Sequence, residues 1–546
     1  MLIYMKTSSI SLISFALSAM AAPFAGAADN TYYIWAGATK ANDEVNLLKS
    51  ANWSTSDAAY AAPAEGTEMN SPQANWVFDY GAYLPVSGKT SSIVHRIKTS
   101  FLDIASISII NHNATKTGYW ASDGFHETGA STCIKFFGSA QNSSWNIGTF
   151  TYTGATGTSD SGVILGSAWE KSQAPDITIG TMNIGQGENT TLFKIGDYAC
   201  SVAYATVENG DIKVGDPVSI YDVTGVKSLT VTGDINLHGN VTFKTNVWNE
   251  DAMASHSEYS PDILVQGVVR MTQSDGGEKP IWDLLYRTRT ISWNNSKPAV
   301  PAIDTFVKIG GLDGSGTISN DSQTIDPSTV KLIFTNKEDC DFSGTFTENR
   351  SSTIKTVMSV KMAGENGKKQ IIRADSAFTG TVEVESGTLI MHSTSALGKL
   401  TMTGGGFGGI EGGVVVSGAE WLGGDIVFHN TETFFGGLAD KITVEGTFTK
   451  SAEGKIGVDF SGLDAASLIE EGNNVFDLIT ANAFEGSFSS DANDDFEAKN
   501  LLNAIADFAW AGNTLTVTFS QVPEPAAIAA LFGALALGLA ALRRRR

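Results

Sequence analysis

The chain has 546 residues, of which 36 are Lys or Arg and 58 are Asp or Glu, so its formal charge is 36 − 58 = −22. This acidic balance argues against a nucleic-acid partner, because phosphate contacts require Lys and Arg. Charged residues make up only 17% of the chain, hydrophobic residues make up 42%, and there are 57 glycines, which together predict a thin core spread over many short elements. The three cysteines, Cys133, Cys200 and Cys340, have no CxxC spacing, so we expect neither a disulfide framework nor a zinc site, and no cofactor.

Residues 1–27 are predicted to be a secretory signal peptide. Lys6 supplies the positive charge before an apolar run, and no further charged residue occurs until Asp29. Ala25 and Ala27 form the small-x-small pattern of a cleavage site. The mature protein is therefore expected to be exported through the inner membrane.

The body, from residue 28 to about residue 520, alternates apolar and polar residues in short runs separated by turns. Turns this close together leave no room for crossover helices, which excludes βαβ units. We expect very little helix before residue 460. The apolar positions predicted to point inward include Leu229, Val231, Ile235, Leu237, Val241, Phe243, Val382, Val384, Leu389, Leu515, Val517 and Phe519.

Two all-β architectures fit this pattern: a series of antiparallel sandwiches, or a right-handed β-solenoid resembling a parallel β-helix. Low charge, abundant glycine and short strands favour the solenoid, in which each rung stacks on the next and the inward side chains form one narrow core. With rungs of about 20–25 residues, about twenty rungs would fit the body.

The composition of the body changes along the chain. Nine of the 11 tryptophans precede residue 300, whereas the second half contains the glycine-rich run from Gly404 to Gly424. We therefore divide the body into a tryptophan-richer β segment over residues 28–300, comprising a cap and solenoid, and a glycine-rich solenoid over residues 301–520. Short helices are predicted over residues 465–471 and 496–508.

One stretch of the second half resembles a known repeat. Residues 378–391 read FTGTVEVESGTLIM and residues 395–405 read SALGKLTMTGG, with weaker echoes at residues 343–346 and 445–448. This pattern of a strand, a Gly-Thr-Leu turn, Ala-Leu-Gly and another strand is similar to the passenger-associated β-strand repeat of autotransporters. The resemblance implies rungs of a β-helix. No β-barrel translocator follows the repeat, so the autotransporter mechanism is not implied.

The C-terminal end reads as a membrane anchor. Residues 526–542 contain no charged or strongly polar side chain, and Arg543, Arg544, Arg545 and Arg546 follow. Seventeen helical residues at 1.5 Å each span about 25 Å, the short end of the range for a bilayer. The arginines are expected to stay on the cytoplasmic side, which places the body outside the inner membrane.

The sequence Val522-Pro523-Glu524-Pro525, the apolar span and the terminal arginines together resemble the PEP-CTERM sorting signal of Gram-negative bacteria. The resemblance covers residues 522–546. It implies that an exosortase, an intramembrane transpeptidase, cleaves near the Pro-Glu-Pro motif, and that the protein is then released to, or attached at, the cell surface or extracellular polysaccharide.

No catalytic motif is present: the chain contains neither GxSxG nor HExxH. Glu383 and Glu385 share one strand face about 7 Å apart, which fits a glycosidase-like pair loosely, but a solvated strand face explains them better. Asp491, Asp494 and Asp495 could bind calcium through oxygen ligands, but a flexible loop is the better interpretation. The sequence from Asp313 to Thr317 similarly favours a turn over a calcium loop.

These observations favour a non-enzymatic, surface-sorted structural or adhesin-like protein. The expected partners are an exosortase-type processing enzyme, the membrane and extracellular polysaccharide. The alternative is a carbohydrate-binding or polysaccharide-degrading β-helix protein. A binding module would need a row of exposed aromatic rings on one face, and an enzyme would need acidic or basic groups that converge in one groove.

Overall fold

A computed structural model describes the greater part of the body and a few residues of the tail. The described residues are 31–34, 44–48, 53–55, 63–79, 92–110, 118–121, 124–127, 133–138, 140, 143–152, 162–168, 175–184, 192–195, 205–207, 212–214, 220–226, 229–239, 242–247, 258, 262–273, 275, 277, 279–284, 304–320, 328–348, 356–373, 375–428, 440–461, 463–472, 474–522, 533–537, 539, 540 and 543.

Most strands belong to one 29-stranded sheet. Its strands are β1 Thr31–Ile34, β3 Trp53–Ser54, β4 Asn75–Asp79, β6 Phe101–Ile110, β10 Ser144–Tyr152, β12 Asp176–Ile184, β14 Ala205–Val207, β15 Ile212–Val214, β17 Leu229–Val231, β18 Ile235–His238, β20 Ile263–Val265, β21 Val269–Thr272, β23 Thr305–Ile309, β24 Leu312–Gly314, β26 Ser328–Phe334, β27 Cys340–Phe342, β29 Thr356–Ala363, β30 Lys369–Ile372, β31 Val382–Ser386, β32 Thr388–Met391, β33 Leu400–Gly409, β34 Val414–Val416, β35 Ala419–Val427, β36 Ile442–Lys450, β37 Ile456–Asp459, β38 Val475–Gly486, β39 Phe496–Lys499, β40 Ala504–Ala511 and β41 Thr514–Gln521.

A second sheet of ten strands runs beside the first over the N-terminal two thirds of the body. Its strands are β2 Glu44–Asn46, β5 Ser92–Ile97, β9 Cys133–Gly138, β11 Gly162–Ala168, β13 Leu192–Ile195, β16 Ile220–Val226, β19 Thr242–Val247, β22 Ile281–Asp283, β25 Thr317–Asn320 and β28 Thr345–Glu348. A small hairpin is formed by β7 Gly118–Ala121 and β8 Gly124–Glu127, and the two helices of the body are α1 Ala465–Glu470 and α2 Ala492–Asp495.

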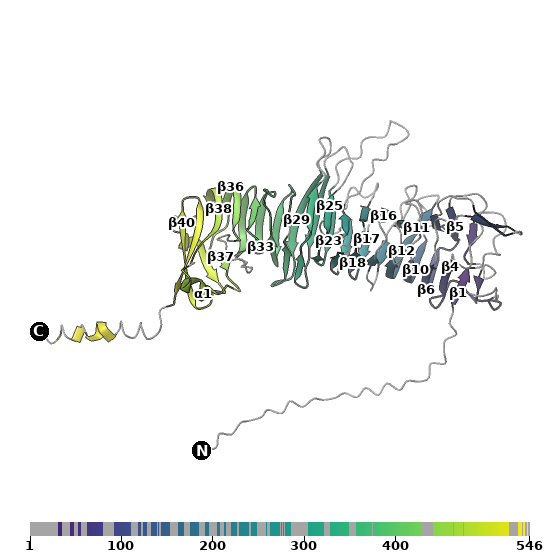
Figure 1. The fold of residues 1–546 in the computed structure, drawn as a ribbon, viewed down its shortest axis with the longest axis horizontal. Coiled ribbons are helices and arrows are strands. Elements are labelled where there is room, and N and C mark those ends of the chain that lie inside the picture. The colour runs from purple at the N-terminus through teal and green to yellow at the C-terminus, as the bar shows by residue number, and fades with distance from the viewer. Residues whose placement is uncertain are drawn as a thin grey trace, which may run out of the picture.

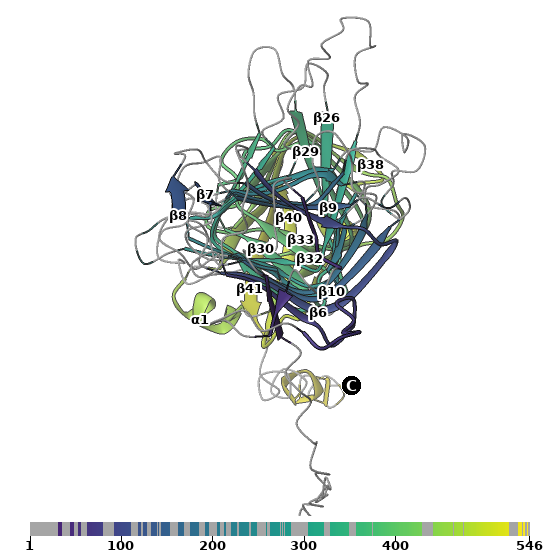
Figure 2. The same cartoon turned by 90° about the vertical axis from the view of Figure 1, so that its right-hand side faces the viewer.

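The strands pair in parallel and stack along one long axis, so that the body is a solenoid-like rod (Figure 1). In the view along that axis the strands surround a common interior (Figure 2). Among the described strands, antiparallel pairs occur only near the ends, between β1 and β3, β7 and β8, β38 and β41, and β40 and β41. Parallel pairing is what a stack of rungs requires, and it argues against the antiparallel sandwich series.

One row of directly paired residues follows the stack from rung to rung. It has fourteen described members: Leu102, Trp145, Ile177, Ala205, Leu229, Ile263, Val307, Leu332, Val360, Val382, Leu400, Ala419, Phe448 and Phe484. The spacing varies from 18 residues, between Val382 and Leu400, to 44 residues, between Ile263 and Val307. The expected regular rung of about 20–25 residues is therefore wrong, because the number of residues between successive paired positions varies widely.

The core is continuous, as the alternating pattern predicts. Eleven of the twelve residues named as pointing inward have fully or almost fully buried side chains, and the twelfth, Val241, lies outside the described residues. Trp53, Trp76, Trp145 and Trp282 are also completely buried, and Trp53 packs against Trp76 with ring centroids 5.2 Å apart. These tryptophans are core residues and do not form an exposed row of aromatic rings.

Glycines allow the long strands to bend where two faces of the stack meet. Gly405 lies within β33 at φ +63, and a Cβ atom there would come 2.4 Å from the Gly387 carbonyl oxygen of the preceding rung. Gly424 lies within β35 at φ +92, and its Cβ would come 2.5 Å from the Gly404 carbonyl oxygen. A side chain at either position would collide with backbone, which explains why this part of the sequence is rich in glycine.

The stack ends in an antiparallel cap formed by β38, β40 and β41. Helix α1 begins after Asp464, whose carboxylate accepts a hydrogen bond from the Ser467 amide, which confirms the helix predicted near residues 465–471. The prediction of a helix over residues 496–508 is wrong, because this segment contains β39 and the first half of β40. Phe496 and Phe508 bury their rings in contact with each other, so packing overrides helix propensity.

Cys340, in β27, has a free thiol that is buried in the stack. Burial, with the nearby carboxylates of Asp313 and Glu338, raises the pKa of this thiol to about 12. We therefore expect Cys340 to resist iodoacetamide in the folded protein at pH 8 and to react after denaturation, because the thiolate is the nucleophile. Peptide mass spectrometry of the alkylated protein measures this, and equal labelling before and after denaturation would contradict it.

The predicted targeting segments are largely outside the described residues. Residues 1–27, including Ala25 and Ala27, are outside them, as are Pro523, Glu524, Pro525, Arg544, Arg545 and Arg546. Residues 533–537 and 539–540 of the tail are helical, and Leu535, Leu537 and Leu539 are exposed. Within the described part of the chain, the helices are too short or too polar to cross a membrane.

Candidate functional site

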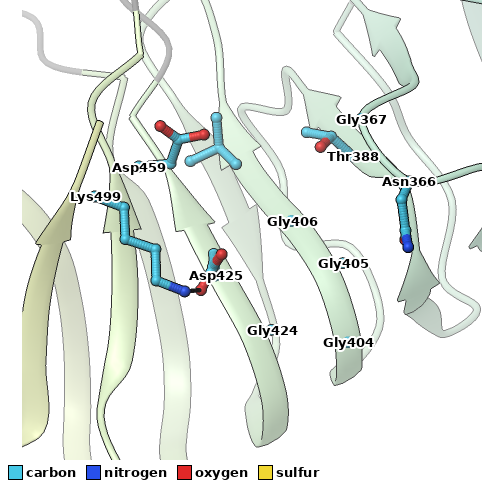
Figure 3. Close-up of a pocket in the computed structure, with 12 residues that line it drawn as sticks. Asn366, Gly367, Thr388, Gly404, Gly405, Gly406, Gly424, Asp425, Asp459 and Lys499 are labelled. Carbon is cyan, nitrogen blue, oxygen red and sulfur yellow. Dashed lines mark hydrogen bonds and ion pairs between the residues drawn. The ribbon is translucent and has the colours of Figure 1, made fainter. Parts of the chain in front are cut away.

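A shallow groove of about 450 Å³ runs over the glycine-rich bend in the C-terminal half of the stack. Its floor is backbone contributed by β33 and β35, where Gly404, Gly405, Gly406 and Gly424 line the groove (Figure 3). Charged side chains lie at one end, and Asn366 and Thr388 lie at the other (Figure 3). The lack of side chains along the floor creates the groove, and its lining is mainly polar.

An ion pair spans two rungs at the charged end of the groove. The Lys499 ammonium donates a hydrogen bond to Asp425 Oδ1 at 2.7 Å, and this bond raises the pKa of Lys499 (Figure 3). Gly457 lies between the two residues, opposite Asp425 in the register. A Cβ at Gly457 would come 2.3 Å from Asp425 Oδ1 and 2.5 Å from Lys499 Cε, so the ion pair occupies the space that a side chain would fill.

A second carboxylate, Asp459, lines the same end of the groove. Its Oδ1 atom accepts hydrogen bonds from the Ser461 amide and from Asn500 Nδ2, both at 2.9 Å. Both carboxylates of the groove therefore accept hydrogen bonds from groups of the protein itself. Such fixed acceptors can orient the hydroxyl groups of a ligand, whereas a glycosidase needs one carboxyl group that is free to donate a proton.

The pair considered from sequence, Glu383 and Glu385, lies elsewhere on the stack, among lysines of neighbouring rungs. Lys331 contacts Glu383 at 3.0 Å, and Lys361 contacts Glu385 at 2.8 Å. Glu258 pairs with both lysines and has a lowered pKa: burial opposes ionisation, but the hydrogen bonds and charges of the lysines outweigh it. Each glutamate of the strand is thus part of a five-residue ion-pair cluster, which supports a structural role over catalysis.

The acidic cluster near residue 491 is ordered and not a flexible loop. Asp491 caps α2 through a 3.0 Å hydrogen bond from the Asn493 amide, and Asp495 is buried in an ion pair with Lys450. Asp313 lies in β24 and accepts a hydrogen bond from the Asp341 amide at 3.3 Å. Among the described residues, no three His, Cys, Asp or Glu side chains are grouped so as to hold a metal ion.

No protein family, curated protein or solved structure matches the chain. The groove was not anticipated from the sequence, although the run from Gly404 to Gly424 marks its floor. Asp425, Asp459 and Lys499 could not be brought together without knowing the rung register, because Asp425 and Lys499 are 74 residues apart.

Proposed function

We propose that the protein is an exported, non-enzymatic surface rod whose body is a right-handed parallel β-helix and whose tail sorts it to the cell surface of a Gram-negative bacterium. The observation that carries this proposal is the uninterrupted parallel stack, which gives an elongated body with a continuous core (Figure 1). A stack of this kind extends a surface far from its point of attachment, as structural and adhesin-like proteins require.

The charged side chains of the stack support a structural role. Ion pairs between successive rungs, such as Arg373 with Asp341 at 2.7 Å and Lys399 with Glu420, satisfy charges on the outside of the rod. Burial of these pairs is incomplete, so water screens them and each contributes little to stability by itself. They favour correct alignment of neighbouring rungs and leave no concentrated catalytic cluster among the described residues.

The tail supplies the sorting part of the proposal. The exposed leucines of residues 533–539 present an apolar surface that is not packed on the stack. In the lipid this surface would be buried, with Arg543 to Arg546 held at the cytoplasmic face. Pro523 and Pro525 disfavour a regular helix outside the membrane, which leaves an extended segment that an intramembrane exosortase can take up.

Replacing Pro523-Glu524-Pro525 by three alanines is expected to block processing while leaving the span inserted. The full-length form should then accumulate in the inner membrane of the native host, whereas the unchanged protein should reach the surface fraction. Cell fractionation followed by immunoblotting measures this distribution. Equal surface amounts of the two proteins would contradict a sorting role for the motif.

The groove favours a second candidate function, retention of extracellular polysaccharide. Its fixed carboxylates and Lys499 offer hydrogen bonds along an open channel, which suits a hydroxyl-rich chain. We expect Lys499→Met to lower retention of the purified protein on the host's extracellular polysaccharide several-fold. Lys399→Met, which removes a similar exposed ion pair outside the groove, is the matched control, and equal retention of both variants would rule out the groove as the binding site.

A further inference from the structure

One ion pair at the C-terminal end of the stack is almost completely buried. Lys450 is the last residue of β36, and Asp495 is the last residue of α2. Lys450 Nζ lies 2.6 Å from Asp495 Oδ1, and the two side chains are only 4% and 3% exposed. Every other described ion pair has a member at least 29% exposed. Among the described ion pairs, this pair is therefore the one in which both side chains are almost completely buried.

Aromatic rings surround the pair. The Lys450 ammonium lies 5.9 Å from the centre of the Phe488 ring, and that ring contacts Phe448, Phe496 and Trp510 at centroid distances of 5.7 to 6.1 Å. This mainly apolar surrounding keeps water away from the amine and the carboxyl group, whose side chains are almost completely buried.

Two hydrogen bonds hold the carboxyl group of Asp495 in place beside the amine. Its Oδ1 atom accepts the hydrogen bond from Lys450, and its Oδ2 atom accepts a 2.6 Å hydrogen bond from the Ser489 amide. A nitrogen that is hydrogen-bonded to one carboxyl oxygen lies close to the carboxyl carbon. The Ser489 N–H is placed to stabilise the negative charge that develops on Oδ2 when the carbon becomes tetrahedral.

We propose that Lys450 and Asp495 condense to form an intramolecular amide bond between Nζ and Cγ. A proton first passes from the Lys450 ammonium to the Asp495 carboxylate, which gives a neutral amine and a neutral acid. The nitrogen lone pair attacks Cγ, the nitrogen passes a proton to the hydroxyl oxygen, and the C–O bond breaks. One N–C bond forms, one water molecule leaves, and no oxidant or other reactant is consumed.

The cross-link would close a loop of 45 residues and tie the end of β36 to the end of α2. The segment between the two residues contains β37, α1 and β38, so these three elements would lie inside one covalently closed loop. The pair lies at the end of the stack nearest the tail (Figure 1), which under the proposed function is the end by which the rod is attached. The bond would resist unfolding at that point.

Peptide mass spectrometry of the full-length protein, purified in its folded form and digested with trypsin, tests this. We expect the peptides that contain Lys450 and Asp495 to be joined, lighter than their sum by one water molecule, with no cleavage after Lys450. Lys450→Arg keeps the positive charge but should yield only linear peptides. Asp495→Asn should yield the same joined product as the unchanged protein, because ammonia then leaves in place of water.

Linear peptides of full mass, with normal cleavage after Lys450 in the folded unchanged protein, would overturn the proposal and leave an ordinary buried ion pair. Joined peptides that persist in the Lys450→Arg variant would also overturn it, because another lysine would then form the bond. Both readings come from the peptide masses and do not require the variants to be as stable as the unchanged protein.

Discussion

Replacing Val384 by Asp is expected to unfold most of the C-terminal half of the stack. Val384 is 1% exposed, and in the register it lies between Met362 of one neighbouring rung and Met402 of the other. An unpaired carboxylate at this point has no partner in the narrow apolar core, so the free energy of unfolding should fall by several kcal/mol, about 4 or more. Urea denaturation followed by circular dichroism measures the loss.

The preceding residue of the same strand provides the control. The Glu383 side chain is 32% exposed and contacts Lys331, so Glu383→Ala should cost no more than about 1 kcal/mol. If Glu383→Ala destabilises the protein as much as Val384→Asp, the assignment of inward and outward faces is incorrect.

Replacing Gly405 by Ala is expected to be almost as damaging, by a different mechanism. Alanine at φ +63 costs about 1–2 kcal/mol, and its Cβ would come 2.4 Å from the Gly387 carbonyl oxygen, which forces the backbone to move. We expect a total loss of about 3 kcal/mol or more in the free energy of unfolding, together with a distorted groove.

Gly454→Ala separates the two contributions. Gly454 also has a positive φ, +96, but no atom lies within 4 Å of its Cβ position. Its substitution should therefore show only the backbone cost, about 1–2 kcal/mol. Equal losses at Gly405 and Gly454 in thermal or urea unfolding would mean that the close approach of rungs contributes little.

The alternation of apolar residues was sufficient to predict which side chains are buried. Leu229, Val382 and Leu515 lie in separate strands, and each was assigned to the core because its neighbours at every second position are apolar. This local signal does not depend on which strands pair. Rung spacing does depend on pairing, and the 44 residues between Ile263 and Val307 show why a fixed repeat length failed.

The cap and the groove could not be predicted in the same way. Residues 496–508 have a helical composition, but Phe496 and Phe508 are drawn into an aromatic cluster that exists only after the chain has folded. Lys499 was predicted within that helix and lies instead in β39, where it reaches Asp425 across Gly457. Contacts between residues this far apart follow from the register, which the order of residues alone does not specify.

The mass of the mature C-terminus in surface material from the native host tests the proposed sorting of the rod most directly. Removal of residues 526–546 after exosortase cleavage near Pro523 to Pro525 should leave a C-terminal peptide that ends at or beside this motif. A surface protein that still carries the apolar span and Arg543 to Arg546 would contradict the proposal, because the tail would then be a permanent anchor.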